Sequence, residues 1–455
     1  MNGDWPRYPS YRTHDALRPP HFGYNRNAIR DEEAKVYKAP RGTMDILPED
    51  QPYWQYLRQH IQQVTAVFGY QPIDIPIFED TSLYVRGVGE GTDIVDKEMY
   101  SFLDKGGREI TLRPEFTAGM VRAYLQHGMK TLPQPVKLYS VGPIFRYEAV
   151  QTGRYRQHTQ FDIECIGELD PAVDLEVMSV AWQLYSNLGF QNLAFQLNST
   201  GCPVCRPGYI RVLVDYHRKH ESEVCEDCRR RLLRNPLRVL DCKVEGCQPV
   251  IAGAPHIQDH LCLECAEHLN TLRRYLDALD RPYTTNHRLV RGLDYYTKTV
   301  FEVWAQGIGA QNAVCGGGRY DGLAEVLGGD HTPGIGFGSG MERLVLTMKG
   351  QGIPVPGLPA PQVMLAYQGE PAKMRALQML NDLRAAGIRA AIGFGGRSLK
   401  AQLRDANRAG ASYALLLGEE EMAAGQVLLK DMLHNAPQER LGQAEIVPAL
   451  LKRLC

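Results

Sequence analysis

The segment VGPIFRYEAVQTGRYRQ, residues 141–157, is the part of this chain on which its interpretation depends. It carries Arg146, Arg154 and Arg156 close to a glycine. Strand arginines beside glycine-bearing turns suit a pocket for phosphate or carboxylate, because guanidinium forms bidentate, charge-assisted hydrogen bonds. Each arginine taken alone is explained better as a surface residue in a solvated ion pair.

Two further segments repeat this combination of arginine and glycine. VRGLDYYTKTVFE contains Arg291, and GIGFGSGMERL contains Glu342 and Arg343. The second segment lacks the spacing of a Rossmann turn, and the sequence contains no P-loop pattern. A nucleotide would therefore be bound without either motif. We predict that the glycines let backbone approach a flat ligand or a neighbouring strand.

Two glutamates stand in strand-like segments with apolar neighbours, Glu115 in TLRPEFTAG and Glu164 in TQFDIEC. Alternation along a strand would turn either carboxylate into a cleft, where burial is costly unless the group is paired. An exposed strand glutamate is the simpler explanation of the spacing alone.

The composition is that of an ordinary globular protein. The 455 residues include 51 Lys and Arg against 52 Asp and Glu, which gives a net charge of −1. This balance excludes a histone-like polycation, so any nucleic-acid contact must come from local basic faces. No apolar run approaches the length of a membrane span, and the N-terminus has no signal-peptide stretch. We therefore expect a cytoplasmic protein with no membrane contact.

Local patterns divide the chain. Residues 1–37 are predicted to be a disordered extension, and Asp50 to cap a helix that ends near Gly69. Residues 287–304 are expected to form a pair of strands. The segment 350–361 has four prolines and three glycines, which is typical of a linker. Beyond it, alternating strand and helix patterns predict a small α/β domain with a largely parallel sheet.

Eight of the 11 cysteines are clustered in pairs within one window of the chain. A reducing cytosol argues against disulfides, and such paired thiols match structural zinc knuckles. Four pairs are enough for two Cys₄ zinc sites, although the spacing does not say which pairs share a metal. Structural cysteines without metal are the alternative. The candidate ligands are Cys202, Cys205, Cys225, Cys228, Cys242, Cys247, Cys262 and Cys265.

Taken together, these segments resemble the histidyl-tRNA synthetase family of class II aminoacyl-tRNA synthetases. The resemblance runs from about residue 38 to 455. It includes the class's second motif at 141–157, the family segment RGLDYY and the third motif GIGFGSGMERL. The other matching segments are APRGTMDILPED, VGEGTDIVDKEMYSF, TLRPEFTAGMVRAYLQHG, GRSLKAQLRDANRAGA and LLKDM.

The resemblance implies an α+β fold. Its catalytic domain is built on an antiparallel sheet and is followed by an α/β anticodon-binding domain. The expected division is a catalytic domain at 38–199 and 285–349, a Cys-rich insertion at 200–284, the linker, and the anticodon-binding domain at 362–455.

The implied reaction is the ATP-dependent ligation of L-histidine to tRNA(His). It passes through a histidyl-adenylate and releases AMP and diphosphate, with Mg²⁺ offsetting the phosphate charge. The family is generally homodimeric. Two alternatives remain at this point: the synthetase-like regulatory subunit of histidine biosynthesis, and a zinc-dependent nucleic-acid-binding protein without catalysis.

Site roles follow from the same resemblance. Arg146 would bind the α-phosphate, Arg343 the far phosphates, and Arg291 both the histidine carboxylate and the α-phosphate, which makes Arg146 and Arg291 the catalytic pair. Phe116 stands where the family usually has glycine, beside the ammonium site. The implied histidine-binding residues are Glu115, Phe116, Thr117, Gln160, Glu164, Arg291, Tyr295 and Tyr296.

A basic stripe is predicted on the helix that starts near Ser398. The basic residues of the stripe lie on one face of the helix, whereas Leu399, Leu403 and Ala406 form another face suited to a core. Such a stripe is typical of a phosphate-contacting surface, and a solvated charged face is the alternative. The resemblance favours tRNA as its partner. The stripe consists of Arg397, Lys400, Arg404 and Arg408.

Overall fold

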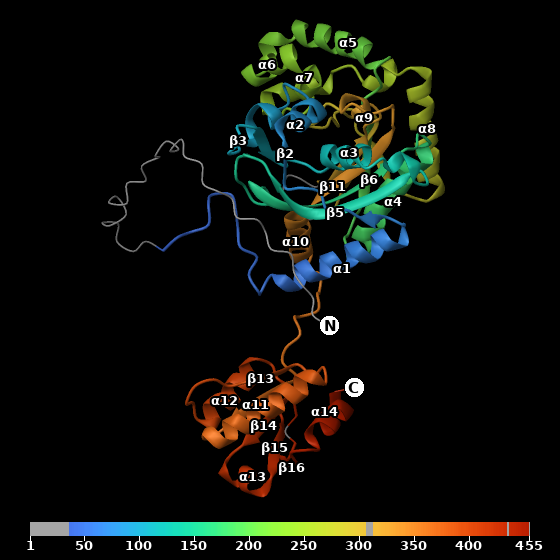
Figure 1. The fold of residues 1–455 in the computed structure, drawn as a ribbon. Helices are drawn as coiled ribbons and strands as arrows, with labels where there is room; N and C mark the ends of the chain where they lie inside the picture. Colours follow the sequence, from blue (N-terminus) through green and yellow to red (C-terminus); the bar gives the residue numbers. More distant parts are fainter. Residues whose placement is uncertain (1–35, 306–312, 435, 455) are drawn as a thin grey trace, which may run out of the picture.

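The computed structural model describes residues 36–305, 313–434 and 436–454. Figure 1 shows a large body and a smaller C-terminal one joined by an extended segment. The predicted N-terminal extension lies outside the described residues except for its last two positions. Among the residues described, no helix is both long and apolar enough to cross a bilayer.

The large body is organised around an eight-stranded sheet of order β1-β5-β6-β11-β10-β9-β7-β8. Its six central strands are antiparallel, and only the short edge strands β1 and β8 pair in parallel. The strands are β1 Gln71–Pro72, β5 Val136–Phe145, β6 Gln157–Ile166, β7 Ala194–Ser199, β8 Tyr283–Thr285, β9 Thr297–Trp304, β10 Ala313–Arg319 and β11 Gly334–Gly340.

One face of this sheet is covered by helices and forms the main apolar core. The helices are α1 Gln51–Val67, α4 Pro171–Asn187, α8 Leu263–Ala278 and α10 Met341–Gly350. The predicted helix after Asp50 is confirmed, but the Asp50 side chain does not cap it and pairs with Lys349 of α10 instead. Strand β11 contributes Ile335 and Phe337 to this core, while its alternate positions are glycines on the opposite face.

The opposite face is only partly covered. Helix α3 packs there on β5 through residues such as Met120, which pack with Leu138 and Ile144 in a second core. The other elements near this face are the helices α2 Thr81–Val88, α3 Thr117–Gln126 and α9 Leu323–Val326, a five-residue π-helical segment Ile94–Glu98, and a three-stranded sheet of β2 Phe78–Asp80, β3 Tyr100–Leu103 and β4 Glu109–Leu112.

A helical insertion follows β7 and has its own apolar core, which includes Tyr209, Leu213 and Ile251. Its main helices are α5 Arg206–Lys219, α6 Glu226–Arg234 and α7 Gln248–Ala252. The predicted end of the insertion at residue 284 is too late. Helix α8 packs its leucines into the main core, and β8 pairs with β7 in the large sheet, so both belong to the large body.

The prediction of two strands over 287–304 is half right, since within this range only β9 is a strand. Residues 286–296 form a loop whose backbone groups bond elsewhere: Asn198 donates its side-chain amide to the Leu289 carbonyl at 3.1 Å, and the Asp294 N–H donates to the Val88 carbonyl at 3.1 Å. The alternating apolar residues that suggest a strand, Leu289, Leu293 and Tyr295, pack instead into small clusters beside the sheet.

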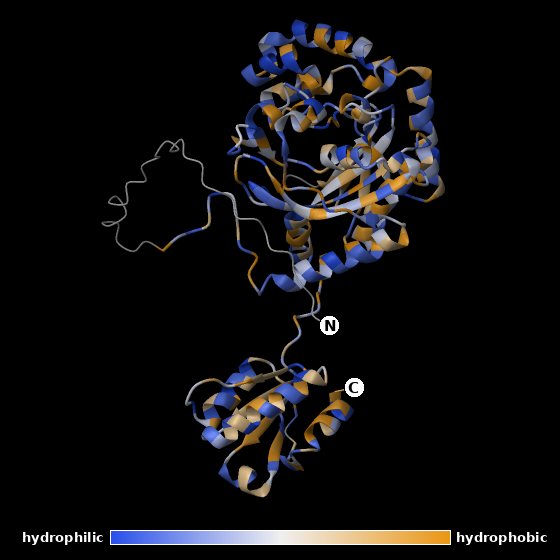
Figure 2. Cartoon of the chain, in the orientation of Figure 1, coloured by the Kyte–Doolittle hydropathy of each residue, from blue (hydrophilic) through white to orange (hydrophobic). Residues whose placement is uncertain are grey.

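The C-terminal body is the predicted α/β domain. Strands β13, β12 and β14 are parallel, whereas β15 and β16 add an antiparallel edge. Figure 2 shows its hydrophobic residues gathered on the central strands and on α14. Its elements are β12 Val363–Tyr367, α11 Glu370–Ala385, β13 Ala390–Ile392, α12 Leu399–Arg408, β14 Tyr413–Leu417, α13 Glu419–Ala424, β15 Gln426–Asp431, β16 Glu439–Gly442 and α14 Ile446–Leu454.

Candidate active site

A cavity of about 740 Å³ opens on the partly covered face of the large sheet, opposite the main core. Strands β6, β9, β10 and β11 form its floor, and the loop 290–296 forms one wall. Of the residues predicted from the sequence, those lining it are Glu115, Thr117, Arg146, Gln160, Arg291, Tyr295, Tyr296 and Arg343.

Glycines make the floor of the cavity. Gln160, Asp162 and Glu164 alternate along β6, and their partners in register on β11 are Gly340, Gly338 and Gly336. A Cβ atom on Gly336 would lie 1.9 Å from a carboxylate oxygen of Glu164, and one on Gly338 would lie 2.0 Å from the Gln160 amide nitrogen. These glycines therefore make room for side chains of the neighbouring strand as well as for a ligand.

Glu115 is fixed at the N-terminus of α3. Its Oε2 accepts the Thr117 N–H at 2.7 Å and its Oε1 accepts the Ala118 N–H at 2.9 Å, which places the carboxylate where helix N–H groups point. The Tyr295 hydroxyl donates to Oε2 at 3.4 Å. Burial raises the pKa of Glu115 above its usual value. Oε1 accepts a single hydrogen bond and keeps a further lone pair with which to bind a cation in the cavity.

Glu164 lies just beneath the lining. Its two oxygens accept hydrogen bonds from the hydroxyls of Thr117, at 2.6 Å, and Tyr320, at 2.5 Å, and both of these residues reach the cavity. Burial raises the pKa of Glu164 to about 8, against the two hydrogen bonds that lower it. Burial and the nearby Glu164 also hold the pKa of Asp162 far above its usual range. A cation in the cavity would favour the ionised forms of these carboxyl groups.

The arginines of the cavity are held by polar contacts. Arg146 donates Nε–H to the Pro114 carbonyl at 2.7 Å, and Arg343 donates Nη1–H to the Ala313 carbonyl at 3.0 Å. Arg291 donates Nη1–H to Glu302 at 2.8 Å and lies over Gly316, where any Cβ would meet the guanidinium within 2.5 Å. The guanidinium groups of Arg146 and Arg291 keep further N–H groups for an anionic ligand.

Phe116 does not line the cavity. Its ring is fully buried in the second core, and the Arg113 guanidinium lies over it at 4.3 Å from the ring centre. Arg113 in turn donates to the carbonyls of Ile75 and Pro143, each at 2.8 Å. The expectation that Phe116 is a histidine-binding residue is therefore not supported, because the ring points away into the core.

Several cavity residues were not predicted from the sequence. Asp162 lies between Gln160 and Glu164 on β6, so the two-residue alternation was a signal that could have found it. Glu302 ends the segment VRGLDYYTKTVFE, which gave it no role, and Tyr320 and His158 have no local motif that marks them. Burial, followed by the charge of Arg146, lowers the pKa of His158 to about 4, so its imidazole is neutral at physiological pH.

The helical insertion forms part of the cavity wall. Arg238, Asp241 and Lys243 contribute to the lining. Arg238 also pairs with Asp93 at 3.2 Å, which joins the insertion to the segment preceding β3. The insertion thus closes one side of the site instead of standing apart from it.

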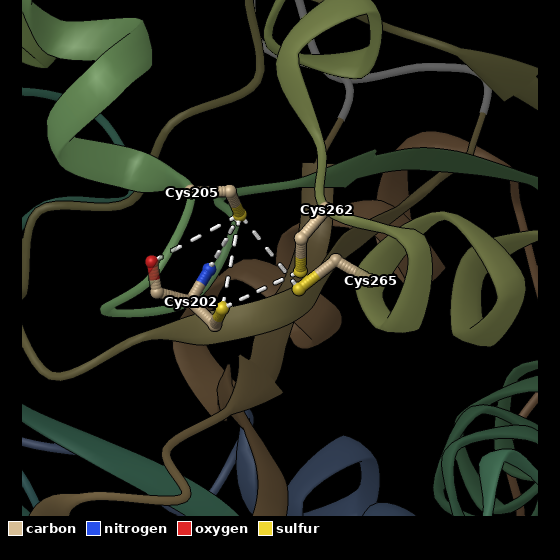
Figure 3. Close-up of side chains that lie close together, drawn as sticks. All are labelled: Cys202, Cys205, Cys262 and Cys265. Carbon is tan, nitrogen blue, oxygen red and sulfur yellow. Dashed lines mark hydrogen bonds between the residues drawn. The ribbon is translucent and has the colours of Figure 1, made fainter.

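The eight clustered cysteines assemble into two groups of four, and within each group the sulphur atoms all lie within 4.8 Å of one another. We name Cys202, Cys205, Cys262 and Cys265 the junction cluster; Figure 3 shows their sulphurs converging. The distal cluster lies within the insertion and consists of Cys225, Cys228, Cys242 and Cys247.

The sulphur separations fit a metal and exclude disulfides. In the junction cluster, Cys202 Sγ lies 3.8 Å from the sulphurs of Cys205 and Cys262, and Cys205 Sγ lies 3.9 Å from that of Cys265. A tetrahedron with Zn–S bonds of about 2.3 Å has sulphurs roughly 3.8 Å apart, whereas a disulfide needs about 2.05 Å. The Cys202 N–H also donates to Cys205 Sγ at 3.3 Å, which stabilises a thiolate.

In the C-terminal body, Lys400 and Arg404 of α12 line an open groove with Lys430, Met432 and His434. The other two residues of the predicted stripe lie close to an acidic side chain instead. Arg397 precedes the helix and pairs with Asp405, and Arg408 lies 3.9 Å from the same carboxylate.

The predicted inner face of α12 is partly wrong. Leu399 and Leu403 are only half-buried, whereas Gln402 and Ala406 are buried. The Gln402 amide nitrogen donates to the Tyr367 carbonyl at 2.8 Å, and its oxygen accepts the Tyr367 N–H at 3.1 Å. These two hydrogen bonds tie α12 to β12.

An antiparallel sheet with this arginine-lined cavity, followed by an α/β domain, has the fold of a class II aminoacyl-tRNA synthetase with an anticodon-binding domain. Residues 42–203 and 217–344 match the histidyl-tRNA synthetase family, and residues 362–453 match the anticodon binding domain family. The chain belongs to the histidyl-tRNA synthetase family.

Individual relatives agree with this assignment. The chain is 53% identical to a histidine–tRNA ligase of Dehalococcoides mccartyi over 90% of this chain and 97% of the relative. It is 51% identical to that of Pelotomaculum thermopropionicum over 86% and 92%. The crystal structure of apo S. aureus histidyl-tRNA synthetase superposes with a TM-score of 0.76 at 37% identity, covering 91% of this chain and 99% of that one.

Proposed function

We propose that this protein ligates L-histidine to tRNA(His) by way of a histidyl-adenylate, using ATP and releasing AMP and diphosphate. The observation that carries the proposal is the cavity in which three arginines converge with Glu115 and the Glu164 group above a glycine floor. The relatives named histidine–tRNA ligase support it over most of their length. The matched anticodon-binding domain does not favour the regulatory-subunit alternative.

The polar walls of the cavity suit free histidine. Glu115, presented by the N-terminus of α3 and backed by Tyr295, supplies negative charge for the ammonium, together with Thr117 and Gln160. Glu164, through Tyr320 and with Tyr296 beside it, supplies partners for the imidazole. Buried polar groups reject an analogue that leaves them unpaired, so such a site discriminates strongly without an editing step.

Adenylate formation requires a carboxylate to approach a polyanion, and the cavity arginines offset that repulsion. Arg291 binds the histidine carboxylate and the α-phosphate, Arg146 the α-phosphate, and Arg343 the far phosphates. Because their positions are already fixed by carbonyl and carboxylate contacts, little reorganisation accompanies the development of charge. The histidine carboxylate oxygen attacks the α-phosphorus, and diphosphate leaves on the opposite side.

Glu342 is the residue that would hold Mg²⁺. Its Oε1 accepts the Thr159 N–H at 2.8 Å, whereas its buried Oε2 has no hydrogen-bond partner among the residues described. Burial raises the pKa of Glu342 to about 7, and a divalent cation favours the ionised carboxylate. When bound, Mg²⁺ would neutralise charge on the phosphate oxygens.

The C-terminal domain binds the tRNA. Lys400 and Arg404, exposed at the open groove, are the residues that we propose contact phosphates, with Arg397 and Arg408 at its margin. Because tRNA is used for protein synthesis in the cytoplasm, we propose that the protein acts there.

The protein is proposed to act as a homodimer. Register places Phe78 of β2 in one row with Tyr100 of β3, and Phe102 two residues further along the same face of the small sheet. Phe78 is 56% exposed and Phe102 is 48% exposed. Exposed aromatic side chains grouped on one sheet face mark an interaction surface, and a second copy is the partner that the family suggests.

The insertion is proposed to hold two structural zinc ions, one in each Cys₄ cluster. The sulphur separations support this proposal, as do the backbone N–H donors to Cys205 and Cys247. Since four thiolates would fill the tetrahedral coordination of each ion, the metal has no open position for catalysis.

Two assays test the proposed activity. Histidine-dependent exchange of diphosphate into ATP should occur without tRNA, and tRNA(His) should then accept labelled histidine. A regulatory histidine-binding protein would bind histidine but catalyse neither step. A zinc-dependent nucleic-acid-binding protein would bind tRNA alone.

A further inference from the structure

The junction cluster stands where the insertion leaves the large sheet and where the chain returns to it. Cys202 and Cys205 follow the end of β7, and Cys262 and Cys265 stand at the beginning of α8. Figure 3 shows the two pairs facing each other from these separate segments. One ion bound by all four thiolates would therefore hold both ends of the insertion together.

The first pair is directly connected to the histidine-binding loop. Arg206, next to Cys205, donates its guanidinium to the Tyr296 carbonyl and, at 2.8 Å, to the Thr200 carbonyl. The Thr200 hydroxyl donates to the same Tyr296 carbonyl at 3.2 Å. Tyr296 itself lines the cavity.

The second pair reaches the same segment from the other side. Glu264, between Cys262 and Cys265, pairs with the Lys298 ammonium at 2.8 Å. The Lys298 side chain is only 8% exposed, whereas that of Glu264 is 71% exposed. Lys298 also lies 3.6 Å from Asp321, which pairs with the fully buried Arg319 at 3.1 Å. The contact thus continues into the interior of the sheet.

The segment held in this way is conformationally restricted. Lys298 has a φ of 48°, in the left-handed region that residues other than glycine rarely adopt. Its N–H donates to the Gly201 carbonyl and its carbonyl accepts the Thr200 N–H, each at 2.8 Å. Residues on both sides of the cluster therefore fix the backbone immediately after Tyr295 and Tyr296. Such backbone persists only where its surroundings hold it.

We propose that zinc in the junction cluster positions Tyr295 and Tyr296 for histidine, with Arg206 and Glu264 as the positioning residues. This inference rests on the proposed function and assigns different roles to the two metal sites. The distal cysteines pack with the insertion's own core, so zinc there stabilises the insertion. Zinc in the junction cluster instead connects metal binding to the recognition of histidine.

The first test uses Glu264→Gln in the full-length protein. Glu264 is exposed and not a proposed metal ligand, so the variant should fold and retain two zinc ions per chain. We expect the histidine KM to rise about three- to tenfold and the ATP KM to stay within about twofold, since glutamine keeps a polar partner for Lys298 but removes its negative charge. Glu267→Gln, on the exposed side of the same helix, is the matched control and should leave both KM values unchanged.

The second test removes the metal site itself. Cys262→Ser with Cys265→Ser should leave one zinc ion per chain by metal analysis, and after cobalt exchange about half of the thiolate-to-cobalt absorption should remain. Histidine should then stabilise the variant less against heat than it stabilises the parent, in a binding assay that needs no turnover. The paired variant Cys225→Ser with Cys228→Ser should lose one zinc ion but keep the stabilisation by histidine.

Three results would overturn the proposal. The first is protein purified without chelators that contains no zinc. The second is an unchanged histidine KM in Glu264→Gln. The third is an equal loss of histidine binding in both paired cysteine variants. Failure of the proposed function would be recognised separately, because the parent protein would then show no histidine-dependent diphosphate exchange whatever its zinc content.

Discussion

Two surfaces of this protein present arginine and lysine to a polyanion, and they are built in different ways. In the cavity, Arg146 and Arg291 are partly buried and held by the Pro114 carbonyl and by Glu302. In the C-terminal domain, Lys400 and Arg404 project from α12 into an open groove. Fixed donors suit a charge that develops at one point in a reaction, whereas exposed donors suit a long polyanion.

Replacing Arg291 by alanine should produce the largest effect. Loss of one fixed donor at developing charge costs about 10²–10³ in rate, so diphosphate exchange should fall by that factor. Arg274→Ala, an exposed arginine on α8, is the control and should leave exchange unchanged. Near-normal exchange by Arg291→Ala would mean that the fixed arginine carries no catalytic charge stabilisation.

Replacing Glu164 by alanine tests the other wall of the cavity. The hydroxyls of Thr117 and Tyr320 lose their buried acceptor, so kcat/KM for histidine should fall by about 30–150-fold, at about 1–1.5 kcal/mol for each of the two unpaired groups. The ATP KM should change by no more than about twofold. Steady-state diphosphate exchange with each substrate varied separately measures both, and an equal rise in the two KM values would contradict the separate histidine subsite.

Removing the exposed charges should have a smaller effect that depends on salt. Lys400→Ala with Arg404→Ala should raise the KM for tRNA(His) by about threefold to tenfold and flatten its dependence on salt, because two phosphate contacts are lost. Diphosphate exchange, which needs no tRNA, should keep its rate. Lys452→Ala, exposed on α14, serves as the control. A salt dependence identical to that of the parent would exclude the groove as a phosphate contact.

The smallest predicted effect concerns stability and pH. The pKa of Glu164 is about 8 in the folded protein against an ordinary value of 4.5, so the folded state retains a proton that the unfolded chain releases. Its contribution to stability is complete below the ordinary value and is lost as the pH rises through about 8.

The variant Glu164→Gln cannot ionise. The difference between its melting temperature and that of the parent should therefore shift in favour of the variant by about 2–4 °C when the pH is raised from 5 to 8. Melting curves at the two pH values measure this gain. The exposed-site variant Glu267→Gln should show the same pH dependence as the parent. A difference in melting temperature between Glu164→Gln and the parent that stays constant with pH would refute a protonated Glu164 in the protein measured without ligand.

The sequence predicted the fold where its signals were regular. The helix after Asp50 and the alternating strands and helices of the C-terminal domain have clear periodicity, and the structure contains them. The loop before β9 was mistaken for a strand, because alternation of apolar residues does not reveal that their backbone groups bond to Asn198 and Val88.

Within the candidate site, motifs located Arg146, Arg291 and Arg343 in the cavity lining. They did not locate Tyr320, which reaches Glu164 from 156 residues away in the chain. Phe116 was assigned to the wrong environment for a related reason. Its neighbours in sequence line the cavity, but the turn into α3 directs its ring to the core. The pairing of the cysteines likewise required contacts across the fold that their spacing does not contain.

The glycine floor limits how this site can change. On β11, the positions whose side chains would point into the cavity are all glycines, and at Gly336 and Gly338 even a methyl group would collide with the next strand. Variation in ligand preference, whether by natural drift or by laboratory selection, is therefore directed to the walls, at Thr117, Tyr295 and Tyr320. For the same reason, an inhibitor that relies on the floor alone would distinguish poorly between proteins sharing these glycines, and selectivity has to be sought at the walls.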